Sequence, residues 1–244
     1  MKEKLKILLI GYGKMGKAIE EVAKERGHSI AAIISDKQID LGHICKAYGA
    51  NLAIEFTSPE AAVHNLESLI DAGIPIVCGS TGWLDSWDKI SDRIKANNGT
   101  LFYASNYSFG MNLMFHLTEI AGRVVNDWPE YEVDIEEIHH LEKKDMPSGT
   151  AITLAQKLLK EINRKKDWVL NQGGPSTIEI SSIREPDVPG THTVSFSSSV
   201  DTIDLTHTAH SRTGFAIGAI RAGEWLLGRK GIFSMEDLLA DRLK

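Results

Sequence analysis

Two histidines, a lysine and a helix-start pattern lie close together in the middle of this chain. The segment 137–151 reads Glu-Ile-His-His-Leu-Glu-Lys-Lys-Asp-Met-Pro-Ser-Gly-Thr-Ala. Histidine can donate a proton near neutral pH. A lysine attracts carboxylates, and so do the exposed N–H groups of a helix that begins at Pro-Ser-Gly-Thr. The segment therefore predicts a site that holds a dianionic substrate and donates a proton to it.

The same segment does not favour a metal site. His139 and His140 would point to opposite faces of an extended strand, which makes them poor joint ligands of one metal. No third ligand follows them at a familiar spacing. We therefore predict no metal.

A second chemical pattern lies near the N-terminus, where the segment 11–16 reads Gly-Tyr-Gly-Lys-Met-Gly. It follows the continuous apolar run Leu5–Ile10 and opens a helix. Glycines allow the backbone to approach a pyrophosphate, and a helix N-terminus favours an anion. Asp36 lies where an acceptor for the adenine ribose is expected, and Lys37 could offset its repulsion of a 2′-phosphate. The alternatives are that the glycines form a purely structural turn and that Lys37 is simply a solvated lysine.

The elements that position these residues are predicted from periodicity. In the first half, apolar strands alternate with amphipathic helices, which predicts an α/β, Rossmann-like doubly wound parallel sheet. A Thr57-x-x-Glu60 capping box with Pro59 in the first turn predicts one helix start. The expected strands are Leu5–Ile10, Ile30–Ile34, Leu52–Phe56, Ile74–Cys78 and Leu101–Ala104.

The second half has a different pattern. Tyr131–His140 alternates as a strand with one solvated face, and 177–208 predicts two or three antiparallel strands. Helices are expected at Met111–Asn126, Thr150–Asn163 and Phe215–Leu227. We predict a dinucleotide-binding domain at 1–107, an α+β substrate-binding and oligomerisation domain with an open mixed sheet at 108–214, and C-terminal helices at 215–244 that return to the first domain.

Composition limits the partners. The net charge of the 244 residues is -6 without a basic block, which argues against a nucleic-acid surface. No apolar run approaches the roughly 18 residues that span a bilayer. The short N-terminal apolar run is better explained as a first strand than as a signal peptide, so we expect a cytoplasmic protein. Cys45 and Cys78 lack metal-ligand spacing and are expected to be reduced thiols.

The segment 137–151 is similar to the signature of the dihydrodipicolinate reductase (4-hydroxy-tetrahydrodipicolinate reductase) family, Glu-x-His-His-x-x-Lys-x-Asp-x-Pro-Ser-Gly-Thr-Ala, with every fixed position present. The likeness also takes in the glycine turn, Phe56–Glu60, Gly79–Gly82, Ser105–Asn112 and the pair at 211–212. Two features depart from the family pattern: the glycine turn is one residue shorter than in many members, and Gly-Ser-Thr-Gly replaces Gly-Thr-Thr-Gly.

The resemblance implies reduction of dehydrated 4-hydroxy-tetrahydrodipicolinate to tetrahydrodipicolinate with NADH or NADPH, on the route to diaminopimelate and lysine. It also implies a homotetramer assembled through the C-terminal domain. His139 would be the proton donor, and Lys143 would act with it on a substrate carboxylate. The implied substrate-binding residues are His140, Lys143, Ser148, Gly149 and Thr150. The implied cofactor-binding residues, together with those placed by the glycine pattern, are Gly11, Tyr12, Gly13, Lys14, Met15, Gly16, Asp36, Lys37, Gly79, Ser80, Thr81, Ala104, Ser105, Asn106 and Tyr107.

Three other functions were weighed. One is a different small-substrate dehydrogenase on the same nucleotide fold, which the paired histidines with Lys143 and the helix start disfavour. A second is a non-catalytic dinucleotide sensor, for which a partner- or DNA-binding element is missing. The third is a metal-dependent hydrolase built on His192, His207 and His210. Packing or surface roles explain His207 and His210 equally well.

The cofactor choice is testable at two neighbouring residues. We expect both cofactors to work, with NADH favoured by no more than about tenfold, or about 1.4 kcal/mol. Asp36→Ala should weaken NADH and spare or improve NADPH, because its carboxylate repels a 2′-phosphate. Lys37→Ala should weaken NADPH selectively. The KM values for NADH and for NADPH, measured at several salt concentrations, check this. If Asp36→Ala leaves the preference between NADH and NADPH unchanged, the ribose contact belongs to another residue.

Overall fold

The computed structural model describes residues 4–35 and 40–241, which form two compact units. Unit 1 comprises Met1–Phe109 with Arg212–Lys244, and unit 2 comprises Gly110–Ser211. Asp36 and Lys37 lie outside the described residues. Among the described residues, no helix combines the length and apolar character needed to cross a membrane.

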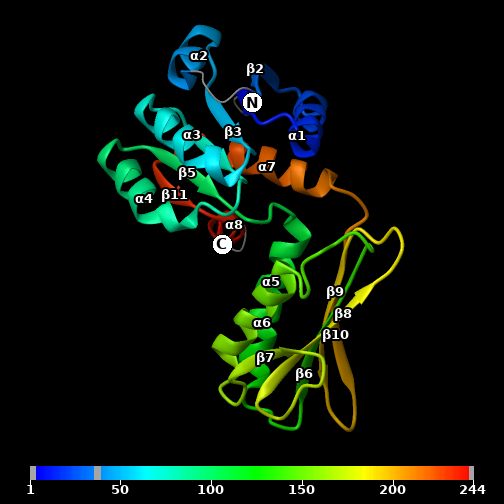
Figure 1. Ribbon diagram of the computed structural model, residues 1–244. Coiled ribbons are helices and arrows are strands. Elements are labelled where there is room, and N and C mark those ends of the chain that lie inside the picture. The colour runs from blue at the N-terminus through cyan, green and yellow to red at the C-terminus, as the bar shows by residue number, and fades with distance from the viewer. Residues whose placement is uncertain (1–3, 36–39, 242–244) are drawn as a thin grey trace. The chain divides into compact units, whose positions relative to one another are not determined.

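Unit 1 is built on a parallel sheet of six strands in the order β11-β5-β4-β3-β1-β2 (Figure 1). The strands are β1 (Lys6–Ile10), β2 (Ser29–Ile34), β3 (Leu52–Glu55), β4 (Ile76–Cys78), β5 (Thr100–Tyr103) and β11 (Gly231–Phe233). From β1 the chain proceeds to β2 on one side and to β3, β4 and β5 on the other. The strand order therefore reverses between β1 and β3, which is where open α/β sheets bind ligands. The prediction of a Rossmann-like doubly wound sheet is confirmed.

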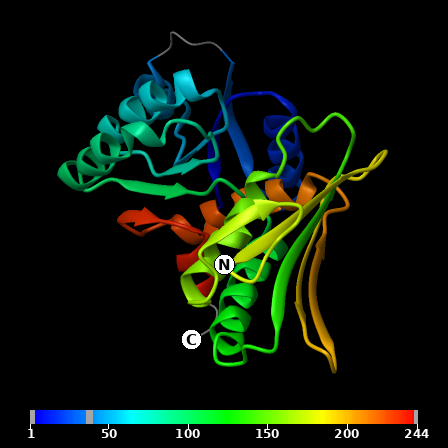
Figure 2. The ribbon, with the colours of Figure 1, turned by 60° about the horizontal axis from the view of Figure 1, so that its bottom comes forward.

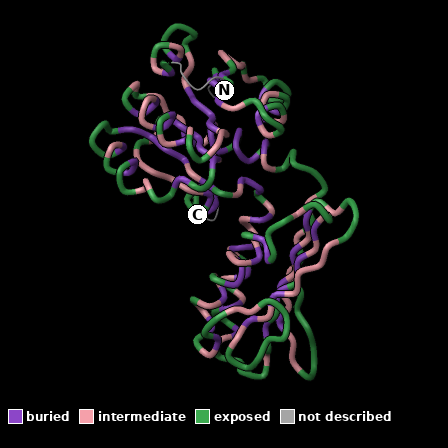
Figure 3. Tube along the Cα trace, viewed as in Figure 1, coloured by how far each residue is buried: buried purple, intermediate pink, exposed green. Residues whose placement is uncertain are grey.

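Helices cover both faces of this sheet. They are α1 (Lys14–Glu25), α2 (Leu41–Tyr48), α3 (Pro59–Asp71), the 3₁₀ turn η1 (Leu84–Ser86), α4 (Trp87–Ala96), α7 (Thr213–Leu226) and α8 (Met235–Ala240). Ile7 and Leu9 of β1 pack in one core with α1, α7 and α8. Leu8 and Ile10 pack in a second core with α2, α3 and α4. This two-sided burial explains why the strand is apolar without alternation. Much of the sheet of unit 1 is drawn as buried (purple) in Figure 3.

Three details of unit 1 differ from the sequence-based expectations. The N-cap of α3 is Ser58, without a side-chain cap hydrogen bond, so the predicted capping box at Thr57 is wrong. The hydroxyl of Thr57 instead donates to the buried carboxylate of Glu55. Neither α2 nor β11 was predicted. The N-cap Asp40, whose carboxylate accepts from the His43 N–H at 3.0 Å, was the available sign of α2.

Unit 2 contains a mixed sheet of five strands in the order β10-β9-β6-β8-β7. The strands are β6 (Glu132–His139), β7 (Asp167–Leu170), β8 (Thr177–Arg184), β9 (Thr191–Ser197) and β10 (Thr202–Thr208). The open mixed sheet was predicted. However, β8 pairs in parallel with β6 and β7, and only β9 and β10 are antiparallel to their neighbours. Two of the strands in 177–208, β9 and β10, are thus antiparallel as predicted, whereas β8 is not; β7 was not predicted.

Two helices, α5 (Phe109–Val125) and α6 (Gly149–Glu161), contribute to the core on one face of this sheet, as both ribbon views show (Figures 1 and 2). Side chains of β6 alternate between this core and the other face, where Glu132, Asp134 and Glu136 are exposed. Among the described elements, no helix covers that other face. Glu137 and His139 have the same parity as Val133 and Ile135, so they point to the helix-covered face.

A close contact in unit 1 makes a test of the packing. On α7, a Cβ added to Gly218 would lie 1.8 Å from the backbone oxygen of Tyr107, whereas one added to Gly214 would meet nothing within 4 Å. Gly218→Ala should therefore destabilise the fold by about 1–3 kcal/mol through overpacking. Gly214→Ala should be neutral or stabilising by up to about 1 kcal/mol, because alanine favours helix. Urea unfolding of both variants checks this, and equal stabilities would contradict it.

Candidate active site

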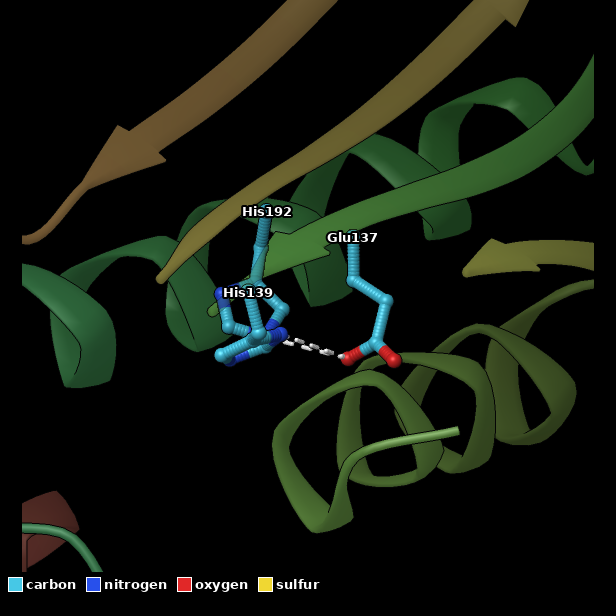
Figure 4. Close-up of side chains that lie close together, drawn as sticks. All are labelled: Glu137, His139 and His192. Carbon is cyan, nitrogen blue, oxygen red and sulfur yellow. Dashed lines mark ion pairs between the residues drawn. The ribbon is translucent and has the colours of Figure 1, made fainter. Parts of the chain in front are cut away.

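A polar cluster lies where β6 approaches its carboxyl end in unit 2. In the strand register, Glu137 is opposite Ser182 of β8 on one side and His192 of β9 on the other. His139, two residues further on, has Arg184 of β8 as its partner. Figure 4 shows Glu137, His139 and His192 close together, with both imidazoles beside the carboxylate. Three neighbouring strands thus bring together residues that are up to 55 positions apart, from Glu137 to His192.

The carboxylate of Glu137 is fully buried, at 0% exposure, and is supplied with hydrogen-bond donors. The hydroxyl of Ser182 donates to it at 2.8 Å and the N–H of Ser148 at 3.0 Å. The guanidinium of Arg184 lies 3.3 Å away and compensates its charge. Burial raises the pKa of the Glu137 carboxyl, but these hydrogen bonds and the neighbouring His139 outweigh burial and hold it below its usual value. Glu137 is therefore a stable buried anion.

Two buried imidazoles face the same carboxylate oxygen. Nδ1 of His139 is 3.4 Å from Oε2 of Glu137, and Nε2 of His192 is 3.8 Å from it. The two rings meet edge to face with centroids 5.0 Å apart. Burial lowers the pKa of His139, an effect that Glu137 opposes and that Lys143 and Arg184 reinforce. Burial, with the nearby charge of His139, lowers the pKa of His192 to about 4.

The predicted helix start after the cluster is present. Ser148 is the N-cap of α6, and its hydroxyl accepts from the Ala151 N–H at 3.2 Å. The first turn of a helix leaves its leading N–H groups without intrahelical acceptors. For α6 these include the N–H groups of Gly149 and Thr150, and a Cβ added to Gly149 would meet nothing within 4 Å. The helix start therefore offers donors and open space to an anion.

Lys143 lies in the turn that joins β6 to α6. Its ammonium contacts both carboxylate oxygens of Asp145 at 2.9 Å, and this pairing lowers the pKa of Asp145. A substrate carboxylate at Lys143 would therefore compete with Asp145. His140 is half-buried just beyond the end of β6, and Lys144 is exposed.

The glycine turn of unit 1 fits the demands of a dinucleotide. Gly11 has φ +89°, and a Cβ there would lie 2.1 Å from the Phe56 oxygen. A Cβ at Gly16 would lie 2.2 Å from the Gly11 oxygen, whereas one at Gly13 would meet nothing within 4 Å. The turn thus packs tightly on the sheet side and leaves space before α1, whose N-cap Gly13 has no capping side chain and whose first turn has no acidic residue. This is the arrangement that accepts a pyrophosphate.

The other residues proposed for the cofactor follow the ends of β4 and β5. Gly79 packs against Phe56, since a Cβ there would lie 2.2 Å from its ring. The Ser80 hydroxyl is buried and accepts from the Thr57 N–H at 2.7 Å. The Tyr107 ring is 1% exposed, and its hydroxyl donates to the Cys78 oxygen at 2.7 Å. The side chains of Ser80 and Tyr107 thus have structural partners, so a cofactor contact at Tyr107 would go through its backbone.

The remaining proposed cofactor residues differ in exposure. Tyr12 and Lys14 are exposed in the glycine turn, and Met15 is partly buried against the first core. Ala104 is buried, while Ser105 and Thr81 are exposed.

Sequence reasoning missed several members of the unit 2 cluster: Glu137, Ser182 and Arg184, with His192 considered only as a hydrolase ligand. A signal for two of them was present. Every second residue of β6 from Val133 onward is buried, and Glu137 occupies one of these positions. On β9, His192 alternates in the same way with the buried Val194 and Phe196. Polar residues at core positions of a strand mark a buried polar site.

The hydrolase alternative is not supported. Within residues 4–35 and 40–241, the groups with suitable ligand atoms do not include His192 with His207 and His210. Instead, Glu137, His139 and His192 each offer a ligand atom within 4.8 Å of the others. His139 and His140 were expected to be poor joint ligands because they are neighbours on one strand, whereas Glu137, His139 and His192 are brought together by the pairing of β6 with β9.

The parallel sheet with a glycine turn at its switch point, together with a buried cluster of a carboxylate and two imidazoles in a second unit, is the arrangement of an NAD(P)-dependent oxidoreductase. Family models for the N- and C-terminal parts of dihydrodipicolinate reductase match residues 5–107 and 110–239. The chain belongs to the dihydrodipicolinate reductase family.

Individual relatives agree. The chain is 45% identical to 4-hydroxy-tetrahydrodipicolinate reductase of Christiangramia forsetii, covering 98% of this chain and 100% of the relative. It is 35% identical to the enzyme of the same name from Syntrophus aciditrophicus, covering 95% and 97%. The solved structure of dipicolinate-bound dihydrodipicolinate reductase from Paenisporosarcina sp. TG-14 has a TM-score of 0.81 at 20% identity, covering 95% of this chain and 98% of that one. At that identity the structure supports the fold alone.

The prediction of an NAD(P)H-dependent reductase of diaminopimelate and lysine biosynthesis is confirmed by the family and the relatives. This result sets aside the sensor and the unrelated dehydrogenase.

Proposed function

We propose that this reductase acts on dehydrated 4-hydroxy-tetrahydrodipicolinate and that His139 donates the proton. The observation that carries the proposal is the grouping of the buried His139 imidazole, the ammonium of Lys143 and the first N–H groups of α6, those of Gly149 and Thr150, within one segment of unit 2. An acid and two kinds of carboxylate-binding group are what protonation of a small dicarboxylate requires.

The cofactor has its own set of residues in unit 1. A reduced nicotinamide, when bound, supplies the hydride. The backbone of Gly11–Gly16 and the N-terminus of α1 would bind the pyrophosphate, and Asp36, with Lys37 beside it, would meet the adenine ribose. Segments 79–81 and 104–107, which follow β4 and β5, would line the remainder of the cofactor.

In the substrate site, each polar group has a distinct task. Lys143 and the N–H groups of Gly149 and Thr150 bind the two carboxylates, and His140 completes the binding surface. Ser148, which is buried and bonded to Glu137 and Ala151, supports this site by holding the start of α6. Two carboxylates close to His139 raise its proton affinity and oppose the effect of burial. Substrate binding therefore favours the imidazolium, so the acid is charged when the substrate is in place.

The assembly and location follow the family resemblance. A homotetramer assembled through unit 2 is supported by the family resemblance, and the face of the unit 2 sheet that no described helix covers offers a surface for it. Dependence on the cellular NAD(P)H pool supports a location in the cytoplasm.

Replacing the proposed acid tests the function directly. His139→Gln should lower kcat by roughly 10²-fold or more, the usual contribution of a positioned proton donor. KM should change less, because the carboxylate-binding groups remain. NADH oxidation is followed at 340 nm while pyruvate and aspartate semialdehyde generate the substrate in place. Wild-type turnover in a folded His139→Gln protein would remove this residue from the mechanism.

The adjacent lysines provide a matched pair. Lys143→Ala should lose a charge-assisted contact worth about 1.5–3 kcal/mol, so that KM rises and kcat falls. Lys144→Ala removes the same charge from an exposed neighbour and should be nearly silent. The same assay measures both, and two equally silent variants would show that Lys143 does not contact the substrate.

A further inference from the structure

Glu137 carries a charge in a place where an unpaired charge is very costly. Its side chain is fully buried, and donors from Ser148, Ser182 and Arg184 converge on Oε1. Oε2 is less occupied: Ser148 N–H reaches it at 3.1 Å, and the two imidazoles face it. One face of a well-anchored carboxylate is thus directed at the proposed proton donor.

The facing nitrogen of His139 lacks any other partner in the part of the chain that the structure describes. Among the described residues, no hydrogen bond is made by the buried Nδ1 of His139, which lies 3.4 Å from Oε2 of Glu137. A small rotation of the ring would complete an Nδ1–H···Oε2 bond. We propose that Glu137 is the positioning residue of the proton donor, holding Nδ1–H of His139 so that Nε2 delivers the proton to the substrate; this rests on the proposed role of His139.

The other nitrogen lies against a residue without a side chain. A Cβ added to Gly190 would lie 3.0 Å from Nε2 of His139, so any larger residue there would crowd this nitrogen. The two nitrogens therefore have different surroundings: a fixed carboxylate at Nδ1 and a glycine at Nε2. Because the hydrogen bond at one nitrogen decides which tautomer is present, Glu137 selects the form with Nδ1–H.

The charged groups around His139 show what Glu137 contributes. On β6 Glu137 raises its proton affinity, and in the following turn Asp145 does the same. Lys143 in that turn and Arg184 on β8 lower it. His192 on β9 has a pKa of about 4 and remains neutral near pH 7, so it does not take the charge from His139. Glu137 is thus the buried anion that favours an imidazolium on His139.

The proton transfer balances without a change at Glu137. The Nε2–H bond of the imidazolium breaks as a C–H bond forms on the substrate, and the N–H electron pair stays on Nε2. The substrate thereby gains this proton and the hydride of the reduced cofactor, which together make a two-electron reduction. His139 is left neutral with its proton on Nδ1, still facing Glu137, and solvent recharges Nε2 for the next turnover.

The tautomer is measured on the wild-type protein. Nitrogen-15 NMR of the imidazole rings, with His139→Gln used to assign the signal, distinguishes Nδ1–H from Nε2–H in neutral histidine. We expect the Nδ1–H form at His139. An Nε2–H form would overturn the proposal, and this result does not require any Glu137 variant to fold.

The second measurement is the pH dependence of kcat/KM for Glu137→Gln. Removing the negative charge lowers the proton affinity of His139, so the basic limb of the profile should shift to lower pH by about one unit, a tenfold change in affinity. The rate at the optimum should fall by roughly 10²-fold or more, in the direction known for serine-protease triads that lose their carboxylate. Glu137→Asp, which keeps the charge, should retain a limb closer to that of the wild type.

Controls separate the possible failures. Glu142→Gln removes one negative charge from the exposed turn after β6 and should leave the limb in place. If His139→Gln loses turnover while Glu137→Gln keeps the wild-type rate and profile, the Glu137 assignment alone fails. If His139→Gln keeps turnover, the proposed function fails at its acid. If dialysis against a chelator abolishes wild-type activity and zinc restores it, Glu137, His139 and His192 bind a metal and the positioning role is overturned.

Discussion

A carboxylate buried in the central strand of a sheet must find all of its donors inside the protein, and the active-site end of unit 2 is organised by that requirement. Ser182 and Arg184 on β8 and the N–H of Ser148 at the start of α6 supply the donors for Glu137. Removing one partner of such a buried pair typically costs about 3–5 kcal/mol. The anion therefore fixes the register of β6 with β8 and the position of the α6 N-terminus together, and both belong to the proposed substrate site.

Each of the two units offers the N-terminus of a helix to an anion, but the two helix starts differ. In each, a helix start without an acidic residue in its first turn offers N–H groups to an anion. Before α1 the cap is Gly13, which has no side chain and leaves space for a pyrophosphate. Before α6 the cap is Ser148, whose hydroxyl occupies the Ala151 N–H and whose own N–H is bound to Glu137. The second site is therefore smaller, in keeping with a carboxylate rather than a dinucleotide.

Much of this arrangement could be predicted from the sequence where a local rule applies. The apolar strands, the glycine turn before α1 and the Pro-Ser-Gly-Thr helix start could be predicted because each depends on neighbouring residues. The capping residue of α3 and the pairing of β8 were not, because Thr57 bonds to Glu55 and β8 pairs beside β6 through contacts distant in sequence. The partners of His139 were missed for the same reason, because they are distant from it in sequence: His192 lies beside His139 only because β6 pairs with β9 in this register. The alternation of buried and exposed residues along β6 could have indicated that Glu137 points into the core, but not which residues contact it there.

The pairing of β6 with its neighbours also limits which length changes this strand can accept in evolution and in protein design. A strand displaced by one position would turn Val133, Ile135, Glu137 and His139 outward all at once, since successive side chains point to opposite faces. The orientation of His139, the proposed proton donor, is thus tied to that of the apolar residues that precede it on the strand, and it cannot change gradually. Insertions or deletions of a single residue in β6 should therefore be rare among natural relatives, whereas length changes in the loop that precedes the strand should be tolerated. An engineer moving this active site to another sheet would have to transplant the whole eight-residue strand with its phase intact.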